Sequence, residues 1–128
     1  MKYISLVAGI LLGLCFLAAS FPILFNLFTP PPMPEGTPAA HFMAAFFPTG
    51  YVKFVKTFEF VGGLLVMIPR VRNLGLLLLG PVIVNILAFH LLVDDDLKHL
   101  LNPMLIVIVV CAHYLVWDAR KKFSALVN

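Results

Sequence analysis

Apolar residues fill four long stretches of the chain, and polar residues gather in the segments between them. A helix that spans a membrane needs about 18 or more consecutive, mainly apolar residues to cross roughly 30 Å of hydrocarbon. The stretches meet or approach that length, and they predict spans over residues 4–28, 51–68, 74–93 and 103–118. We therefore expect an all-α fold, an integral membrane four-helix bundle that forms a single domain over residues 1–128.

Helix start and stop signals lie at the ends of these stretches. Pro69 ends the second stretch, because proline cannot continue the hydrogen-bond ladder of a helix. Asn73 is predicted to cap the third stretch, and the acidic run of residues 94–96 ends it. Asn102 precedes Pro103, which suits the first position of a helix, so the fourth stretch begins there.

The first stretch begins like a secretory signal. Lys2 precedes the apolar run, and Ala18, Ala19 and Ser20 form a small-residue sequence of the kind that signal peptidases cleave. The apolar run nevertheless continues to Phe28, which makes it long enough to span a membrane. We therefore expect an uncleaved anchor.

The outer loop over residues 29–50 starts with a proline-rich segment that excludes regular helix before Gly36. Thr37 is predicted to cap a short helix that ends before Pro48. Aromatic and methionine side chains four residues apart, such as Phe42 and Phe46, give this helix an apolar stripe. We expect it on the outer surface or over the mouth of the bundle, and a plain connector is the alternative.

Composition and charge agree with a membrane protein. The chain is 62% hydrophobic and only 12% charged, and its mean hydropathy is +1.04. If four spans alternate, most basic residues fall on one side: Lys2, Arg70, Arg72, Arg120, Lys121 and Lys122. Because basic residues are enriched in cytoplasmic loops, both termini are predicted to be cytoplasmic in a multi-pass protein of the bacterial inner-membrane type. The sequence has no basic face with interleaved aromatic residues, so no nucleic-acid partner is predicted.

The second stretch contains charged residues where the rest of the apolar sequence avoids them. Lys56, Glu59 and Gly63 lie within a narrow sector of a helix. A charge at the centre of a bilayer costs about 2.5–3.5 kcal/mol on insertion scales, so this face is predicted to turn into the bundle. Either Lys56 and Glu59 form an ion pair, or burial keeps Glu59 protonated. Gly62 and Gly63 would let a neighbouring backbone approach closely.

Partners for this pair can be sought at the same depth in the third stretch. At a rise of about 1.5 Å per residue, Asn85 is level with Glu59 and His90 is level with Lys56, although Asn85 and His90 point about 140° apart. Pro81 frees the carbonyl of Leu77 and is expected to kink the helix. The alternatives are a purely structural ion pair, an Asn85 that joins helices, and a His90 that is only hydrated.

Several chemistries find no support in the sequence. The four histidines have no close ligand spacing, so no metal site is predicted. Cys15 and Cys111 lie in different stretches, which excludes a C-x-x-C redox pair. No arrangement of nucleophile and base is visible, which favours a non-enzymatic protein without settling whether it is an enzyme.

Two adjoining segments carry a resemblance to a known family. "KTFEFVGGLLVMIPR" and the following "LGLLLLGPVIVNILAFHLL" resemble the DoxX family of small four-helix bacterial membrane proteins. The family's second span has a glutamate followed by two glycines and a basic turn, which correspond here to Glu59, Gly62, Gly63 and Arg70. The second segment resembles a DoxX-like subgroup, through residues Gly80, Pro81, Asn85 and His90.

The resemblance implies a four-helix membrane bundle with both ends in the cytoplasm, and a link to quinone or thiol redox complexes. This chain lacks the paired cysteines of bundles that transfer disulfide electrons. Our first hypothesis is a non-enzymatic subunit that binds a quinone or a lipid beside Glu59 and serves a membrane oxidoreductase. The second is an assembly factor or scaffold whose polar layer is structural, and the third is a proton-linked conductance, with an oligomer left open.

Overall fold

The computed structural model describes residues 2–94 and 97–127. It confirms the all-α class, since the chain is 78% helical and the described residues contain no strand. Residues 95 and 96, which belong to the predicted acidic stop, lie outside the described residues. The elements, in chain order, are α1 (Lys2–Leu24), α2 (Pro38–Phe46), α3 (Tyr51–Met67), α4 (Arg72–Ala88), the π-helix η1 (Phe89–Val93), the 3₁₀ helix η2 (Leu97–Leu101), α5 (Pro103–Asp118) and α6 (Arg120–Ser124).

Capping residues explain where two of these helices begin. The Thr37 hydroxyl accepts a hydrogen bond from the backbone N–H of Ala40 at 3.2 Å, so the predicted cap of α2 is confirmed. The Asn102 side chain accepts from the N–H of Met104 at 2.9 Å, and α5 starts at the next residue, Pro103, as predicted.

Two predicted helix boundaries differ from the structure. The first helix ends at Leu24 instead of residue 28, because Asn26 adopts a left-handed backbone with φ of 56°. The predicted cap Asn73 is wrong, because α4 already begins at Arg72. The Arg72 side chain donates through Nε to the carbonyl of Val66 at 3.1 Å, which closes the turn from α3 without an asparagine cap.

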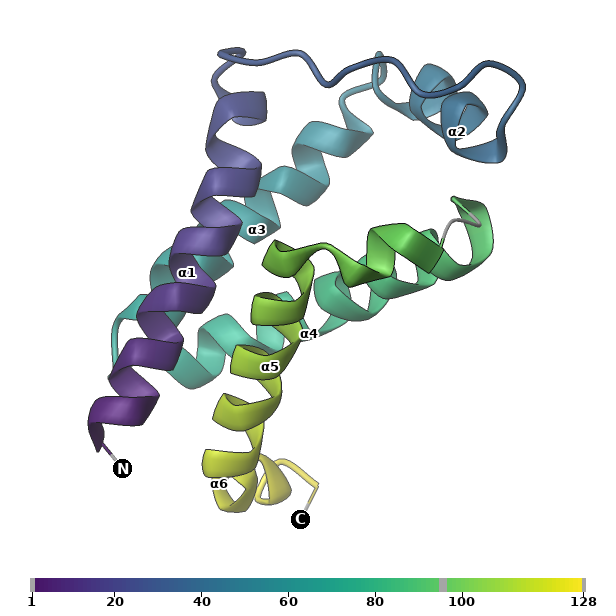
Figure 1. Ribbon diagram of the computed structural model, residues 1–128. Coiled ribbons are helices and arrows are strands. Elements are labelled where there is room, and N and C mark those ends of the chain that lie inside the picture. Colours follow the sequence, from purple (N-terminus) through teal and green to yellow (C-terminus); the bar gives the residue numbers. More distant parts are fainter. Residues whose placement is uncertain (1, 95–96, 128) are drawn as a thin grey trace.

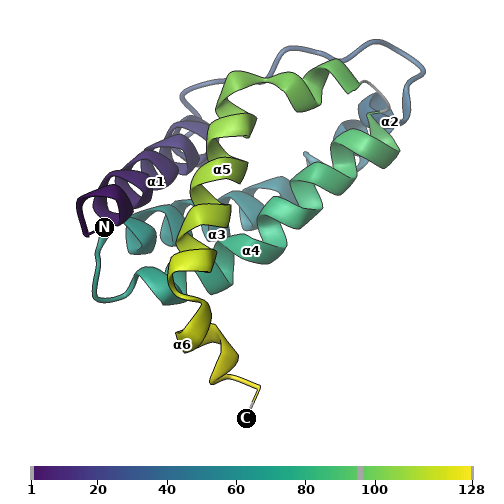
Figure 2. The same ribbon diagram turned by 60° about the horizontal axis from the view of Figure 1, so that its bottom comes forward.

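Helices α1 and α3 pack against each other, and each of them also packs against one further long helix. Helix α1 lies against both α3 and α5, and α3 also packs against α4, whereas α4 and α5 contact each other less (Figures 1 and 2). Both termini lie at the lower end of the molecule in Figure 1. The Ser5 hydroxyl donates to the Asp118 carboxylate at 2.8 Å, which ties the start of α1 to the end of α5.

Glycines allow the close contacts of α3 with its neighbours. A Cβ on Gly13 of α1 would lie 2.5 Å from the carbonyl oxygen of Gly63, and a Cβ on Gly62 would lie 2.7 Å from the Leu79 side chain of α4. Both distances are shorter than a real carbon contact. The predicted role of Gly62 and Gly63 in helix packing therefore fits the contacts, and Gly75 of α4 meets the backbone of Val66 in the same way.

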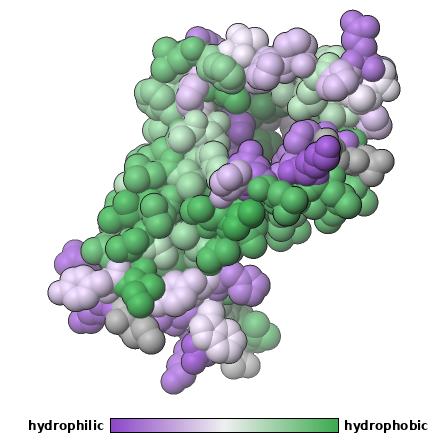
Figure 3. All heavy atoms as spheres, in the orientation of Figure 1, coloured by the Kyte–Doolittle hydropathy of each residue, from purple (hydrophilic) through white to green (hydrophobic). Residues whose placement is uncertain are grey.

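The side chains between these helices form one apolar core. Its fully buried members come from all four long helices: Leu12 and Phe16 of α1, Val66 of α3, Leu79 of α4 and Leu115 of α5. Much of the remaining apolar surface points outward, as the apolar side chains over the middle of the molecule in Figure 3 show.

Within residues 2–94 and 97–127, two helices are long and apolar enough to cross a membrane: α1 and the continuous segment Arg72–Val93, which joins α4 to η1. Helix α3 has 17 residues and three charged side chains, and α5 has 16 residues. At about 1.5 Å per residue they reach only about 26 and 24 Å, short of roughly 30 Å of hydrocarbon.

Candidate functional site

Helix α3 places one carboxylate in the interior of the protein. Glu59 is only 2% exposed, and it shares the buried face of α3 with Gly62, Gly63 and Val66. These residues are spaced three and four apart, so they follow one stripe of the helix. The prediction that this face turns inward is confirmed for Glu59.

Lys56 lies one helical turn away and pairs with this carboxylate. Its Nζ is 2.9 Å from Oε2 of Glu59, and its side chain is 20% exposed. Oε2 is buried, and no residue in the described part of the chain forms a hydrogen bond to it. Of the two predicted arrangements, the structure therefore has the ion pair, and it leaves acceptor capacity on Glu59 unused.

The other predicted members of the polar layer do not join this pair. The side chain of Asn85 is exposed, and no hydrogen bond or ion pair among the described residues links it to Glu59. His90 is half-buried and points to Asp94 instead. Pro81 is exposed on α4, and the helix continues past it to Ala88.

Lys53, the third charged residue of α3, has a partner that the sequence did not predict. Its ammonium donates to the side-chain oxygen of Asn26 at 2.7 Å. Asn26 sits in the turn after α1, where its positive φ directs the chain away from the helix. The contact joins the ends of α1 and α3 that lie nearest to the proline-rich loop.

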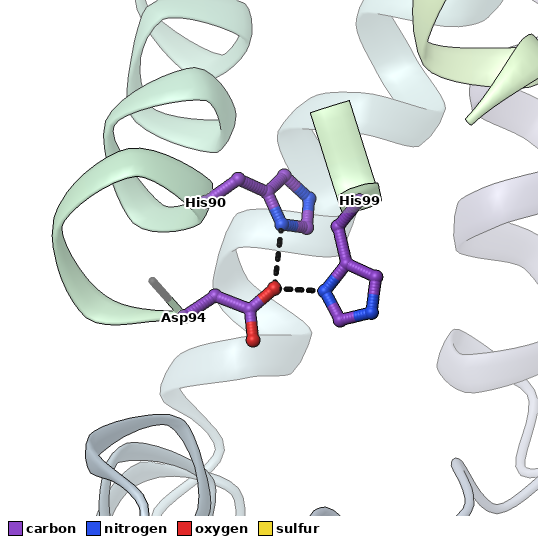
Figure 4. A group of neighbouring side chains, drawn as sticks. All are labelled: His90, Asp94 and His99. Carbon is purple, nitrogen blue, oxygen red and sulfur yellow. Dashed lines mark hydrogen bonds and ion pairs between the residues drawn. The ribbon is translucent and has the colours of Figure 1, made fainter. Parts of the chain in front are cut away.

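A second polar cluster was missed entirely by the sequence analysis. The imidazoles of His90 and His99 both hydrogen-bond through Nδ1 to the same oxygen, Oδ2 of Asp94, as Figure 4 shows. The His90 contact is 3.2 Å long. His90 lies in η1 and His99 in η2, and these two elements pack together. The histidines are nine residues apart, so the usual short ligand spacings did not reveal them, although the four-residue step from His90 to Asp94 is a helical-face signal.

The electrostatics of this cluster favour an ionised carboxylate. Asp94 follows the last residue of the apolar segment, and its side chain is 13% exposed. The hydrogen bond from His99, followed by that from His90, lowers the pKa of Asp94 below its ordinary value, against the opposing effect of burial.

Two hollows on the surface lie away from both clusters. An apolar groove of about 490 Å³ between α1 and α5 is lined by residues such as Val7, Leu11 and Val110, and Glu59 is not among them. A polar cleft of about 480 Å³ lies at the opposite end from the proline-rich loop, and its lining includes Arg72, Asp118 and the basic residues of α6. The apolar groove can cover a hydrocarbon chain, and its lining also includes Tyr3, Cys111 and Tyr114.

No protein-family model, curated protein or solved structure matches this chain. The resemblance to the DoxX family stays a prediction.

Proposed function

We propose that the chain is a multi-pass membrane protein of DoxX type, in which α1, α3, α4 and α5 form a four-helix bundle. The lipid bilayer is the partner that its surface fits. Only 17% of the apolar window of segment Arg72–Val93 is buried inside the protein, whereas the core helix of a soluble protein is mostly buried. Val84 and Val110, for example, remain 66% and 61% exposed on the outer faces of α4 and α5.

In this proposal the short helices α3 and α5 cross the membrane because they pack beside a longer helix, although neither is as long as the hydrocarbon is thick. Each packs against α1, which is long enough to cross a membrane. A bilayer thins locally around a short span, at a cost of fractions of a kcal/mol per Å of mismatch. The charges of α3 are also compatible with lipid, because Glu59 points inward and Lys53 reaches Asn26 at the helix end.

We further propose that the Lys56–Glu59 pair binds the polar end of a small hydrophobic molecule, as a non-enzymatic subunit would for a membrane oxidoreductase. The observation that carries this proposal is the buried Oε2 of Glu59, which has an ion-pair partner but no hydrogen bond. A ligand hydroxyl could donate to this oxygen, and a ligand carbonyl could accept from Lys56. A quinone carries ring carbonyls, its reduced quinol carries hydroxyls in their place, and a lipid headgroup carries hydroxyls or carbonyls as well.

The test uses the substitution Glu59→Gln, which keeps the size of the side chain and removes its charge. The matched control is Glu35→Gln, at an exposed position in the proline-rich loop. The purified proteins are compared by mass spectrometry for co-purified quinones and lipids, and by circular dichroism for helix content. We expect Glu59→Gln to lower the retention of one species at least about tenfold, the loss that accompanies about 1.4 kcal/mol, with unchanged helix content.

A second candidate, a scaffold or assembly factor, is favoured by the ion pair itself. At 2.9 Å the ammonium already neutralises the carboxylate. Under this second candidate the pair has a single role, which is to fix the packing of α3. In that case Glu59→Gln changes the thermal stability in detergent and leaves every co-purified molecule in place. That result would exclude the ligand site.

A further inference from the structure

The cluster of His90, Asp94 and His99 has the composition of a transition-metal site. One nitrogen of each histidine and one carboxylate oxygen of Asp94 all lie within 4.8 Å of one another. In Figure 4 the two imidazole rings come from different elements, and each directs a nitrogen to the same carboxylate oxygen of Asp94. No other group of three such side chains gathers in the part of the chain that the structure describes.

These donors suit a divalent ion of the Zn²⁺ class. Imidazole nitrogen and carboxylate oxygen bind Zn²⁺ at about 2.0–2.2 Å, which places neighbouring tetrahedral ligands about 3.4 Å apart. The contact from His90 to Asp94 is 3.2 Å, close to this ligand spacing, and the donor atoms of all three residues lie within 4.8 Å of one another. With an ion bound through Nδ1, each neutral imidazole would carry its proton on Nε2, and the Asp94 oxygen would coordinate the ion in place of its two hydrogen bonds.

The local backbone explains how the three residues meet. The π-helix η1 widens the turn between His90 and Asp94, and π-helical turns are frequent at functional sites. The ring of Phe89 packs against Phe42 of α2 at a centroid distance of 5.2 Å, which holds η1 from the other side. His99 then completes the set from η2.

The three side chains of the cluster differ in how much of their surface is exposed. The side chains of Asp94 and His90 are 13% and 25% exposed, whereas that of His99 is 55% exposed. Three protein ligands leave a fourth position of a tetrahedral ion for water or an external ligand.

We propose that His90, Asp94 and His99 form a binding site for one divalent transition-metal ion, with Zn²⁺ as the best-matched species and one coordination position open to solvent. The ion would link η1 to η2 and so restrain the connection between α4 and α5, which contact each other less than α1 contacts α3 or α5 and less than α3 contacts α4. This site lies on different elements from the Lys56–Glu59 pair and does not depend on the function proposed for that pair.

The experiment titrates Zn²⁺ into the full chain in detergent, after removal of any affinity tag and of bound metal with a chelator. Isothermal calorimetry is expected to show one ion per chain. His99→Ala and His90→Ala are each expected to weaken binding at least about tenfold, because even the loss of an outer contact to a ligand costs 10–100-fold. The matched control, His41→Ala, removes an exposed histidine of α2 and should leave affinity unchanged.

Two further measurements separate the site from loose attraction to surface carboxylates. Co²⁺ bound by two imidazoles and one carboxylate is expected to give a visible absorption band that His99→Ala abolishes. Asp94→Asn should weaken Zn²⁺ binding more than Glu35→Gln does, since Glu35 is exposed in the proline-rich loop. The proposal is overturned if both histidine variants, with unchanged circular dichroism, bind Zn²⁺ as the unmodified chain does. Equal losses in His41→Ala or Glu35→Gln would overturn it as well.

Discussion

Two carboxylates of this protein show how the surroundings of a charged residue decide its role. Glu59 is 2% exposed and has one cation beside it, with Oε2 left without a hydrogen bond. Asp94 is near the end of a helix and shares one oxygen between two imidazoles. Unused capacity on a buried acceptor points to a missing polar partner, whereas two imidazole nitrogens gathered beside a carboxylate oxygen form a ligand set for a metal cation. The two residues therefore favour different kinds of ligand.

Glycine positions provide a prediction that can be tested at single residues. A Cβ on Gly13 would lie 2.2 Å from the Met67 side chain and 2.5 Å from the backbone oxygen of Gly63. The methionine can move, but the backbone oxygen cannot move without separating α1 from α3. We expect Gly13→Ala to lower the free energy of unfolding by about 1–3 kcal/mol, the usual cost of overpacking. Thermal or denaturant unfolding in detergent measures this change.

Gly80 provides the matched control for that substitution. A Cβ at Gly80 meets nothing within 4 Å, and the residue lies inside α4. Alanine is favoured over glycine in a helix by about 1 kcal/mol, so Gly80→Ala should be neutral or stabilising. Equal destabilisation by both substitutions would show that the contact between Gly13 and Gly63 is not the cause.

At the scale of elements, sequence signals were most accurate where a local rule sets a helix end. The caps Thr37 and Asn102 act through side-chain oxygens that can reach only their own first turn, and both were predicted correctly. Asn73 failed as a cap because the long side chain of Arg72 reaches back to the carbonyl of Val66. Helix α6 was not predicted at all, because its five residues have no apolar periodicity of their own.

Contacts between elements were harder to predict than the elements themselves. The rise per residue places Asn85 level with Glu59, but the rotation of α4 about its axis turns Asn85 outward. The depth of a residue does not determine that rotation. The packing of α1 on α3 could have been anticipated, because Gly9 and Gly13 form a G-x-x-x-G motif. The cluster of His90, Asp94 and His99 depends on a π-helical turn, for which no sequence pattern was available.

The packing of α2 supports a prediction at this scale. The ring of Phe42 lies 4.9 Å from that of Phe46 and 5.2 Å from that of Phe89, which joins α2 to the end of the apolar segment. Aromatic pairs contribute about 0.5–1.5 kcal/mol each beyond the burial of area. We expect Phe42→Ala to cost about 1–3 kcal/mol and to expose the proline-rich loop to limited proteolysis.

Phe54 is the matched control for Phe42. It also pairs with a second ring, that of Phe58 at 5.1 Å, but it is 61% exposed and both rings belong to α3. Phe54→Ala should therefore leave the cleavage rate of the loop unchanged. If the two variants are cleaved equally fast, α2 is not held in place by its aromatic contacts.

At the scale of the whole molecule, charge is distributed unevenly between the two ends. Six of the nine basic residues lie near the termini or in the turn after α3: Lys2, Arg70, Arg72, Arg120, Lys121 and Lys122. Contacts bring these segments together, since Ser5 binds Asp118 and the position of Gly9 adjoins the Arg72 side chain. The proline-rich loop and α2, with Glu35, lie at the other end of α1 (Figure 1). In a bilayer this arrangement would hold the basic end in the cytoplasm.

Cysteine labelling tests this orientation and the multi-pass proposal together. In a background with Cys15 and Cys111 replaced by alanine, a cysteine at Glu35 should react with a membrane-impermeant maleimide added outside intact cells. A cysteine at Lys121 should react only after the membrane is permeabilised, because charge bias keeps the basic end inside. The reverse labelling pattern would invert the orientation but retain the spans. Equal protection of both positions, with equal reaction after permeabilisation, would place the two ends on the same side, and α1 could then not cross the membrane between them.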